Sequence, residues 1–329
     1  MKKVLYVNQE IANKTLCGIG YIGDLVGRTI CKSQKHKIEI LHTDNAQKVL
    51  DYIQKYDPDV IFYNFSTTTM PWVSSGKWRF GLRAKQILIF HDGGQNTVDN
   101  FSPDNWYGFD YLVMPDDCVN TKKSKNVFTT RRLIIPHKPR TQYVEKDIPV
   151  IGFQGQLVPH KGLHNVVKQV QNEFDEAIIR VHSPSYHYGP GQKIWNMTLD
   201  YAKKSIHKPG ISIVHTHDIK TNEEVVDFLA ENTINCYFYD YLDGYGLASS
   251  TDFALAAKRP FAVTRSHQFR NYWDSDPSII IENNSLKNII SNGLSPLEKY
   301  YQEYTEENVI DDYEKIIDFV SKKGTSFSF

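Results

Sequence analysis

The stretch Gly152–Gly162 reads G-F-Q-G-Q-L-V-P-H-K-G, and it decides how the surrounding chain folds. It follows the apolar residues Pro149–Ile151 and precedes an amphipathic run over Leu163–Phe174, which together predict a strand, a glycine-rich turn and a helix. Such a turn leaves backbone N–H groups free at the start of a helix, where an anion binds. Lys161 adds a mobile positive charge suited to phosphate. The sequence therefore predicts a phosphate or diphosphate site in the middle of the chain.

Short apolar runs alternate with helical patterns on both sides of this stretch. The expected strands before it are Lys3–Val7, Lys37–Leu41, Val60–Asn64, Gln86–Phe90, Tyr111–Met114 and Leu133–Pro136. Those from it onward are Val150–Phe153, Ala177–Val181, Ile211–Val214, Asn235–Tyr239 and Pro260–Thr264. The expected helices include Cys17–Ile30, Ala46–Tyr56, Leu163–Phe174, Gly191–Ile206 and Asn222–Asn232. Alternation of this kind predicts an α/β fold with parallel sheets covered on both faces.

Two helix starts carry the pattern of a capping box, in which a Ser or Thr precedes a Glu by three residues. Thr221 is followed by Glu224 in one of them. Ser295 is followed by Glu298 in the other. Both pairs predict that a helix begins immediately after the hydroxyl residue.

A polar segment without periodicity, Lys138–Pro149, divides the two series and is expected to be an interdomain linker. We therefore expect two doubly wound, Rossmann-like domains over residues 1–145 and 146–307. An apolar stripe at helical spacing predicts a C-terminal helix over about 308–323, which is expected to pack back on the first domain. Ligands of such sheets bind at the carboxyl ends of the strands.

The composition narrows the class of protein. The formal charge is zero, from 38 basic and 38 acidic residues, which argues against tight nonspecific binding to a nucleic-acid backbone. The apolar run at the N-terminus stops at Asn8, too early for a signal peptide, and no run is long enough for a membrane span. The four cysteines (Cys17, Cys31, Cys118 and Cys236) lack C-x-x-C spacing. They are expected to be reduced thiols, which points to a cytoplasmic protein.

A second strand, glycine turn and helix start lies in the later half of the chain. Asp243–Leu247 reads D-G-Y-G-L after an apolar strand. Ser250 and Thr251, at the start of the following helix, have hydroxyls that suit helix capping or a phosphate. Asp252 is an acidic residue of the kind that accepts ribose hydroxyls in nucleotide sites. This part of the chain is therefore a candidate nucleotide contact.

Together the two segments, G-x-x-G-x-L-x-P-x-K-G and D-G-Y-G-L…D…A-x-x-x-R-P-F-A-V-T, resemble the C-terminal half of retaining GT-B glycosyltransferases. The likeness covers mainly Val150–Thr264. It implies a GT-B fold in which two Rossmann-like domains face each other across a cleft. Residues 1–145 would form the acceptor-side domain, and residues 146–307 would bind a nucleotide-diphosphate sugar. It further implies metal-independent transfer of a hexose or pentose to an acceptor hydroxyl with retention of configuration.

The resemblance implies roles for single residues. Three are implied in catalysis: His91 would hydrogen-bond the sugar, Asp243 would lie near the donor sugar, and Lys161 would bind the diphosphate. The implied donor-binding residues are Gly18, Gly20, Gln156, Lys161, Gly244, Tyr245, Gly246, Ser250, Thr251, Asp252 and Arg265. Leaving-group stabilisation by Lys161 and by helix N-termini would carry most of the catalysis.

The chain also departs from the family pattern. Gln156 stands where the family has Arg, and His160 where it has Glu. The acidic pair is Asp243 and Asp252 with eight residues between, rather than two Glu with seven between. Arg265 is the expected substitute for the missing cation. The Gln156 departure keeps open a non-catalytic nucleotide- or glycan-binding GT-B protein. A sugar-nucleotide epimerase or phosphorylase of the same architecture is the other alternative.

The acceptor is expected to be a glycan or a hydroxylated DNA base, contacted by loops that carry Trp72, Trp78 and Trp106, since such rings stack on sugars and bases alike. No cofactor is expected besides the donor, linked to UDP or GDP. No metal is expected either. His215 and His217 alternate on a strand end beside Asp218, but a further ligand is not evident. The oligomeric state stays open.

Overall fold

The computed structural model describes residues 1–10, 18–67, 70–75, 78–184, 191–217 and 221–322. By compactness the chain divides into two units. The first unit comprises Met1–Leu133, Gly244–Gly246 and Glu303–Phe329. The second unit comprises Ile134–Asp243 and Leu247–Gln302.

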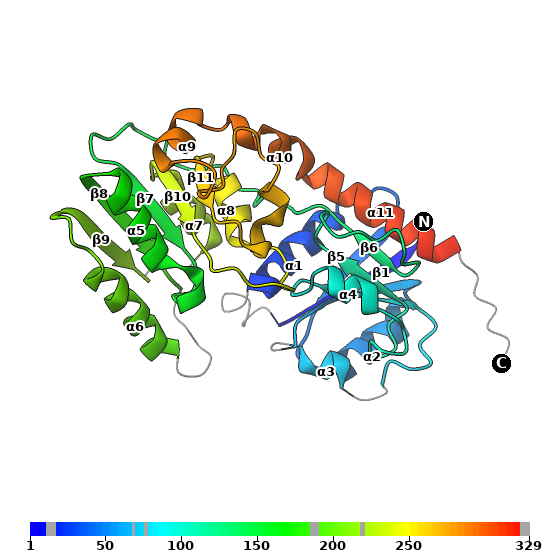
Figure 1. Cartoon of the computed structure of the whole chain (residues 1–329). Coiled ribbons are helices and arrows are strands. Elements are labelled where there is room, and N and C mark those ends of the chain that lie inside the picture. Colours follow the sequence, from blue (N-terminus) through cyan, green and yellow to red (C-terminus); the bar gives the residue numbers. More distant parts are fainter. Residues whose placement is uncertain (11–17, 68–69, 76–77, 185–190, 218–220, 323–329) are drawn as a thin grey trace. The chain divides into compact units, whose positions relative to one another are not determined.

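The first unit is built on a six-stranded parallel sheet (Figure 1). In spatial order the strands are β2 (Lys37–His42), β1 (Lys3–Asn8), β3 (Val60–Phe65), β4 (Lys85–Phe90), β5 (Tyr111–Met114) and β6 (Val127–Thr129). Its helices are α1 (Gly18–Ile30), α2 (Ala46–Tyr56), α3 (Pro71–Ser74), α4 (Gln95–Asn100) and α11 (Glu306–Lys322). Every residue of β3 is buried, as expected for a strand with helices on both faces.

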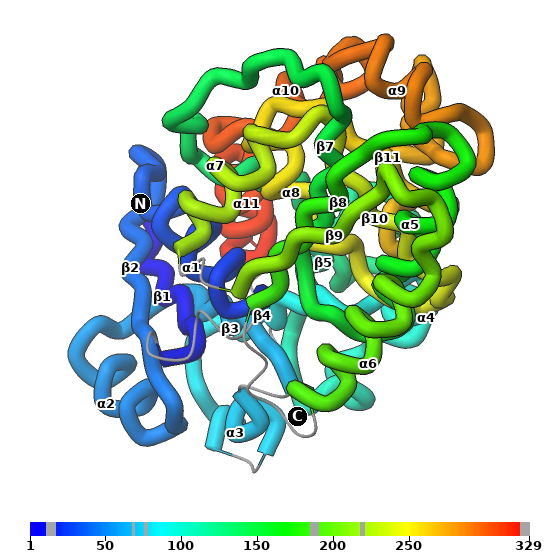
Figure 2. The backbone as a smooth tube through the Cα atoms, turned by 90° about the vertical axis from the view of Figure 1, so that its left-hand side faces the viewer, coloured from blue at the N-terminus to red at the C-terminus, as the bar shows by residue number. Residues whose placement is uncertain are grey.

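The second unit is built on a five-stranded parallel sheet, in which β7, β8 and β9 lie side by side (Figure 2). In spatial order the strands are β11 (Phe261–Val263), β10 (Ile234–Tyr237), β7 (Val150–Gln154), β8 (Glu176–His182) and β9 (Gly210–Thr216). Its helices are α5 (Leu163–Glu173), α6 (Gly191–Lys204), α7 (Asn222–Ala230), α8 (Ser250–Ala256), α9 (Leu286–Asn292) and α10 (Glu298–Glu303). Its described residues also form the short 3₁₀ helices η2 (Pro159–Lys161), η3 (His267–Tyr272) and η4 (Ser295–Leu297).

The α/β class and the two Rossmann-like halves are therefore confirmed. The boundary expected at 145/146 stays a prediction, as does a cleft between the halves. Helix α11, in the region where a C-terminal helix was expected, packs on α1 within the first unit. Lys32, two residues after α1, forms an ion pair with Glu306 of α11 at 2.7 Å, and the Tyr313 ring packs edge-on against Phe62.

The strand expected over Leu133–Pro136 is wrong. The last strand of the first sheet is β6, which ends at Thr129. Immediately after it, the backbone N–H of Arg131 donates to the Asp312 carboxylate of α11 at 2.9 Å. Leu133 and Ile135 are buried without joining the sheet. Their apolar pattern therefore reports burial, and the backbone turns locally here, where the N–H of His137 donates to the carbonyl of Ile135 at 2.7 Å.

One of the two predicted capping boxes is confirmed. The Thr221 hydroxyl accepts from the backbone N–H of Glu224, and the Glu224 carboxylate accepts from the N–H of Thr221. The second box is wrong, because the backbone N–H of Glu298 donates to the carbonyl of Ser295 and not to its hydroxyl. The region starts as the 3₁₀ turn η4, without a side-chain cap.

Candidate functional site

The predicted glycine turn occupies the carboxyl edge of the second sheet. Strand β7 leads into Gly155 (φ 139°), η2 and Gly162 (φ 68°), which is the N-cap of α5 and has no side-chain cap. A β-carbon on Gly162 would lie 1.8 Å from the carbonyl oxygen of Phe238, so only glycine fits at this position. The start of α5 is thereby held directly against the chain that follows β10.

Lys161 lies at this helix start. Its ammonium is 3.9 Å from the centroid of the Tyr239 ring, a cation–π geometry. Burial, followed by the charge of Lys161, lowers the pKa of the neighbouring His160. A positive charge and the amino end of a helix therefore meet at one place, and both favour an anion.

Two further polar groups lie at this edge, and the sequence analysis missed them. Gln154 and His182 are paired in register on β7 and β8. The Gln154 Oε1 and His182 Nδ1 atoms are buried and have no hydrogen-bond partner within the described part of the chain. Burial lowers the pKa of His182 to about 4, so its ring is neutral near pH 7. In the sequence, the signal for Gln154 and His182 was a polar residue at the end of an apolar strand.

In the second unit, the later motif contributes Asp243 at the surface and Ser250, Thr251 and Asp252 in the interior. The side chain of Asp243 is 78% exposed and lies 3.8 Å from the ring of His267. Asp252 is only 2% exposed. The Thr251 hydroxyl donates to the carbonyl of Ala248, and the Ser250 hydroxyl accepts from Tyr239 at 3.0 Å. Ser250, Thr251 and Asp252 therefore contribute to the packing of α8, and their roles toward a donor stay predictions.

Arg265 follows β11, two strands away from the β7 end that carries Gln156. Its backbone N–H donates to Glu282, and its exposed guanidinium lies over the Trp273 ring. Gln156 itself is partly exposed after β7. That Arg265 replaces a cation at Gln156 stays a prediction.

In the first unit, the predicted glycines lie in α1. Gly18 begins the helix, and residues 11–17, between it and β1, are outside the described residues. A β-carbon on Gly20 would lie 1.9 Å from the side-chain nitrogen of Gln9. The carbonyl of Gly20 accepts from the Asn8 amide at 3.0 Å. The start of α1 is thus packed tightly against the end of β1.

His91 follows β4 and joins a chain of amides. The Asn64 amide nitrogen donates to Asn8 Oδ1 and to the carbonyl of Ile19, which turns Asn64 Oδ1 toward His91. The His91 Nε2 atom lies 2.7 Å from that oxygen and must donate to it. Burial, followed by the charge of Arg132, lowers the pKa of His91 to about 3. The ring is therefore neutral, with Nδ1 as its acceptor.

Gly244–Gly246 count with the first unit, and the structure shows why Gly246 is a glycine. A β-carbon there would lie 1.6 Å from the carbonyl oxygen of His91. Gly94 lies close to Gly244, with 3.5 Å between its added β-carbon and the Gly244 Cα. Tyr245, between the two glycines, is 48% exposed. Two separately predicted segments are thus brought together in this unit.

The three tryptophans named for the acceptor pack against the apolar core of the first unit. The Trp78 indole N–H donates to the carbonyl of Trp72, and the two rings are 5.8 Å apart. Trp106 contacts Phe90 and Phe101. All three are partly buried, and a role in acceptor binding stays a prediction.

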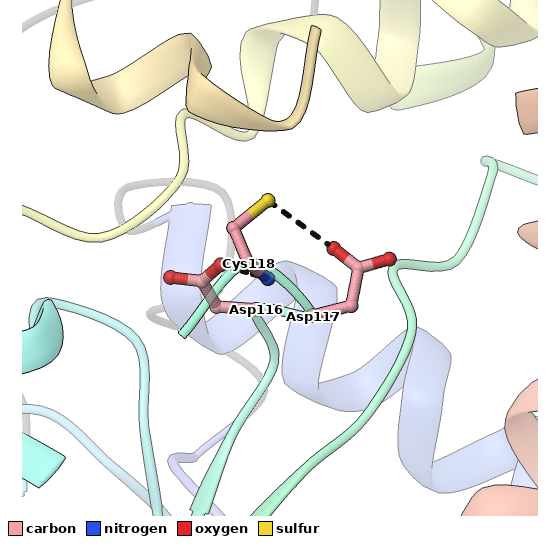
Figure 3. A group of neighbouring side chains, drawn as sticks. All are labelled: Asp116, Asp117 and Cys118. Atoms are coloured by element: carbon pink, nitrogen blue, oxygen red, sulfur yellow. Dashed lines mark hydrogen bonds between the residues drawn. The ribbon is translucent and has the colours of Figure 1, made fainter. Parts of the chain in front are cut away.

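One group of possible metal ligands lies after β5 (Figure 3). In it, the Asp116 carboxylate accepts from the backbone N–H of Cys118, and the Cys118 thiol points at Asp117, which also accepts from Tyr304. These hydrogen bonds account for the grouping, and we assign it no role. His215 and His217 both pack edge-on against the ring of Trp195, and Asp218 is outside the described residues.

Among the described helices, none combines the length and the apolar character that crossing a membrane requires. No protein-family profile matches the sequence. No curated protein matches it either.

Solved structures do match the fold. Sucrose-phosphate synthase from Thermosynechococcus elongatus aligns with a TM-score of 0.70 at 9% identity, over 97% of this chain and 99% of that one. Anabaena HepE, in complex with UDP and glucose, aligns with a TM-score of 0.62 at 10% identity, over 98% and 100% of the two chains. Trehalose-6-phosphate synthase from Burkholderia multivorans aligns with a TM-score of 0.62 at 9% identity, over 98% and 100%. The chain has the GT-B fold of these glycosyltransferases.

Proposed function

We propose that the protein is a glycosyltransferase that takes a hexose from a UDP-linked donor. One observation carries the proposal: Lys161 is held at the amino end of α5, on the carboxyl edge of the second sheet. This edge is where ligands of parallel α/β sheets bind. A structure of HepE, one of the proteins of similar fold, contains UDP-glucose. UDP is therefore the first nucleotide to test, and GDP the second.

The mechanism follows from the charge that develops on the leaving group. As the bond from the sugar to the diphosphate breaks, negative charge grows on the departing UDP. The Lys161 ammonium and the N–H groups at the start of α5 are suited to stabilise that charge, and a fixed arrangement does so without reorganisation. We propose that no metal is required, because these groups supply the positive potential.

On the first unit, His91 has a defined role in this proposal. Its Nε2–H is committed to Asn64, so its neutral ring offers Nδ1 as an acceptor. We assign it the acceptance of a hydrogen bond from a hydroxyl of the donor sugar. We further propose retention of configuration, in keeping with the resemblance of the sequence motifs, and a glycan acceptor, in keeping with the zero formal charge.

The first experiment is titration of the protein with UDP and GDP in the presence of EDTA, followed by thermal unfolding. A ligand at about 100 times its dissociation constant stabilises the folded state by roughly 2.7 kcal/mol. Lys161→Ala is expected to weaken UDP binding about tenfold to hundredfold, the usual effect of losing a charge-assisted contact. Exposed Lys193→Ala on α6 is the matched control and is expected to bind as the wild type does.

Turnover is then measured with UDP-glucose, a panel of glycans and DNA that contains hydroxymethylated cytosine. The anomeric configuration of the product, read by NMR, tests retention. Binding of UDP without transfer or hydrolysis would favour the non-catalytic alternative, which the Gln156 departure supports. Failure to bind either nucleotide would refute the donor site itself.

A further inference from the structure

The turn that carries Lys161 is fastened to the segment after β10 at three points. The N–H of Asp240 donates to the carbonyl of His160 at 2.8 Å. The amide of Asn165 donates to the carbonyl of Phe238 at 3.2 Å. The Cα of Gly162 approaches that same carbonyl more closely than any side chain would allow. The backbone of Lys161 therefore has a fixed position relative to residues 238–240.

Within that segment, Tyr239 presents its ring to the lysine. The ring is 3.9 Å from the Lys161 ammonium. Tyr239 is 2% exposed, and its hydroxyl donates to Ser250 at 3.0 Å. Its ring packs against Phe269 at 4.7 Å, and its carbonyl accepts from the Thr264 hydroxyl at 2.6 Å. The orientation of the ring is therefore set by contacts independent of Lys161.

An aromatic face suits this task better than a carboxylate. A carboxylate would neutralise the ammonium and compete with a phosphate, whereas a ring attracts the cation through its quadrupole. A free lysine side chain samples many rotamers, and ordering it on ligand binding costs affinity. A lysine already held over a ring has incurred most of that cost in the free protein, and its N–H donors remain available on the side away from the ring.

We propose that Tyr239 is a positioning residue, which holds the Lys161 ammonium over its ring in the orientation that receives the diphosphate of the donor. This inference rests on the proposed function, because it assigns Lys161 to the donor phosphates. The sequence alone did not suggest this role for Tyr239, because a tyrosine at the end of an apolar strand is ordinarily a core residue.

The test replaces the ring at position 239 and compares UDP with uridine. Tyr239→Phe keeps the ring and is expected to bind UDP within about twofold of wild type. Tyr239→Leu removes the ring face and is expected to bind UDP about threefold to thirtyfold more weakly, the range of a cation–π contact. Uridine, which lacks phosphate, is expected to bind both variants equally. A variant that merely disturbs the fold would weaken both ligands.

Two further comparisons test the coupling. In the Lys161→Ala background, Tyr239→Leu is expected to have no additional effect on UDP binding. A series of fluorinated phenylalanines at position 239 keeps the shape and the fold while weakening the ring quadrupole. UDP affinity is expected to fall stepwise along it. Unchanged UDP affinity along the series would overturn the inference. So would a loss of UDP affinity from Tyr239→Leu that is equally large in the wild-type and Lys161→Ala backgrounds. Absence of UDP and GDP binding by the wild type would instead refute the proposed function.

Discussion

The Nε2 atom of His91 lies 2.7 Å from the Oδ1 atom of Asn64, and this contact fixes which ring nitrogen of His91 carries the proton. Asn64 is held in turn because its amide nitrogen donates to two oxygens, those of Asn8 and Ile19. The ends of β1, β3 and β4 are thereby joined to the start of α1 by side-chain amides. A histidine that looked like a separate candidate is the last member of a structural network.

Removal of Asn64 tests that network. Asn64→Leu leaves the Asn8 and Ile19 oxygens and the His91 N–H without their partner in a buried place. We expect the free energy of unfolding to fall by about 2–3 kcal/mol, as for other buried groups that lose a partner. Urea unfolding measures it. Asn100→Leu, an exposed amide at the end of α4, is the control and is expected to change stability by no more than about 0.5 kcal/mol.

The neutral ring of His91 predicts a pH dependence of stability. Burial lowers the pKa of His91 to about 3, whereas a histidine in an unfolded chain titrates near 6.5. Between these values the unfolded chain binds a proton that the folded state does not, so the free energy of unfolding falls as pH drops from about 6.5 toward 3. Above about 6.5 the group contributes nothing. In His91→Asn the decrease between pH 7 and pH 5 is expected to be shallower, as measured by urea unfolding. Parallel curves would show that His91 is not the group responsible.

Local sequence patterns predicted the parts of the fold that depend on local contacts. The capping box at Thr221 is confirmed because both of its hydrogen bonds join residues three apart. The same pattern at Ser295 is wrong because the N–H of Glu298 donates to the backbone carbonyl of Ser295 within the 3₁₀ turn η4. The apolar run at Leu133 predicts burial but not backbone pairing, and the backbone there turns locally from Ile135 to His137. Burial was predictable there, and strand pairing was not.

In the candidate site too, features that depend on neighbouring residues were predictable, and contacts between distant residues were not. The glycine turn before Lys161 was predictable, since glycine and lysine at a helix start have a direct physical meaning. Its aromatic support at Tyr239 was not, because that contact joins residues 78 positions apart along the chain. The amide of Asn64 was missed for the same reason, as was the buried Nδ1 atom of His182, which has no hydrogen-bond partner among the described residues. Polar residues at the ends of apolar strands were the signal that the sequence offered for both.

Gly162 is predicted to tolerate no side chain. Alanine there meets two penalties: a positive φ, which costs about 1–2 kcal/mol, and a β-carbon 1.8 Å from the Phe238 oxygen. Gly81 is the matched control, because its φ is also positive but no atom of the described residues lies within 4 Å of an added β-carbon. We expect Gly162→Ala to lower the free energy of unfolding by clearly more than Gly81→Ala in thermal or urea unfolding. Equal losses would mean that the turn shifts easily away from β10.

Gln156 is the position where a single substitution should improve the proposed donor site. It follows β7 at the same sheet edge as Lys161, and it is partly exposed, so an arginine there has room to extend. A second cation facing a diphosphate adds charge-assisted hydrogen bonds, which strengthen binding by about 1.5 kcal/mol or more. Gln156→Arg is therefore expected to bind UDP about tenfold more tightly, while its affinity for uridine stays the same.

Gln192→Arg on the exposed face of α6 is the matched control for a change of net charge alone. If both arginines raise UDP affinity equally, the gain is a general electrostatic effect. If Gln156→Arg leaves UDP binding unchanged while Lys161→Ala abolishes it, the diphosphate lies on the α5 side of the turn, out of reach of position 156.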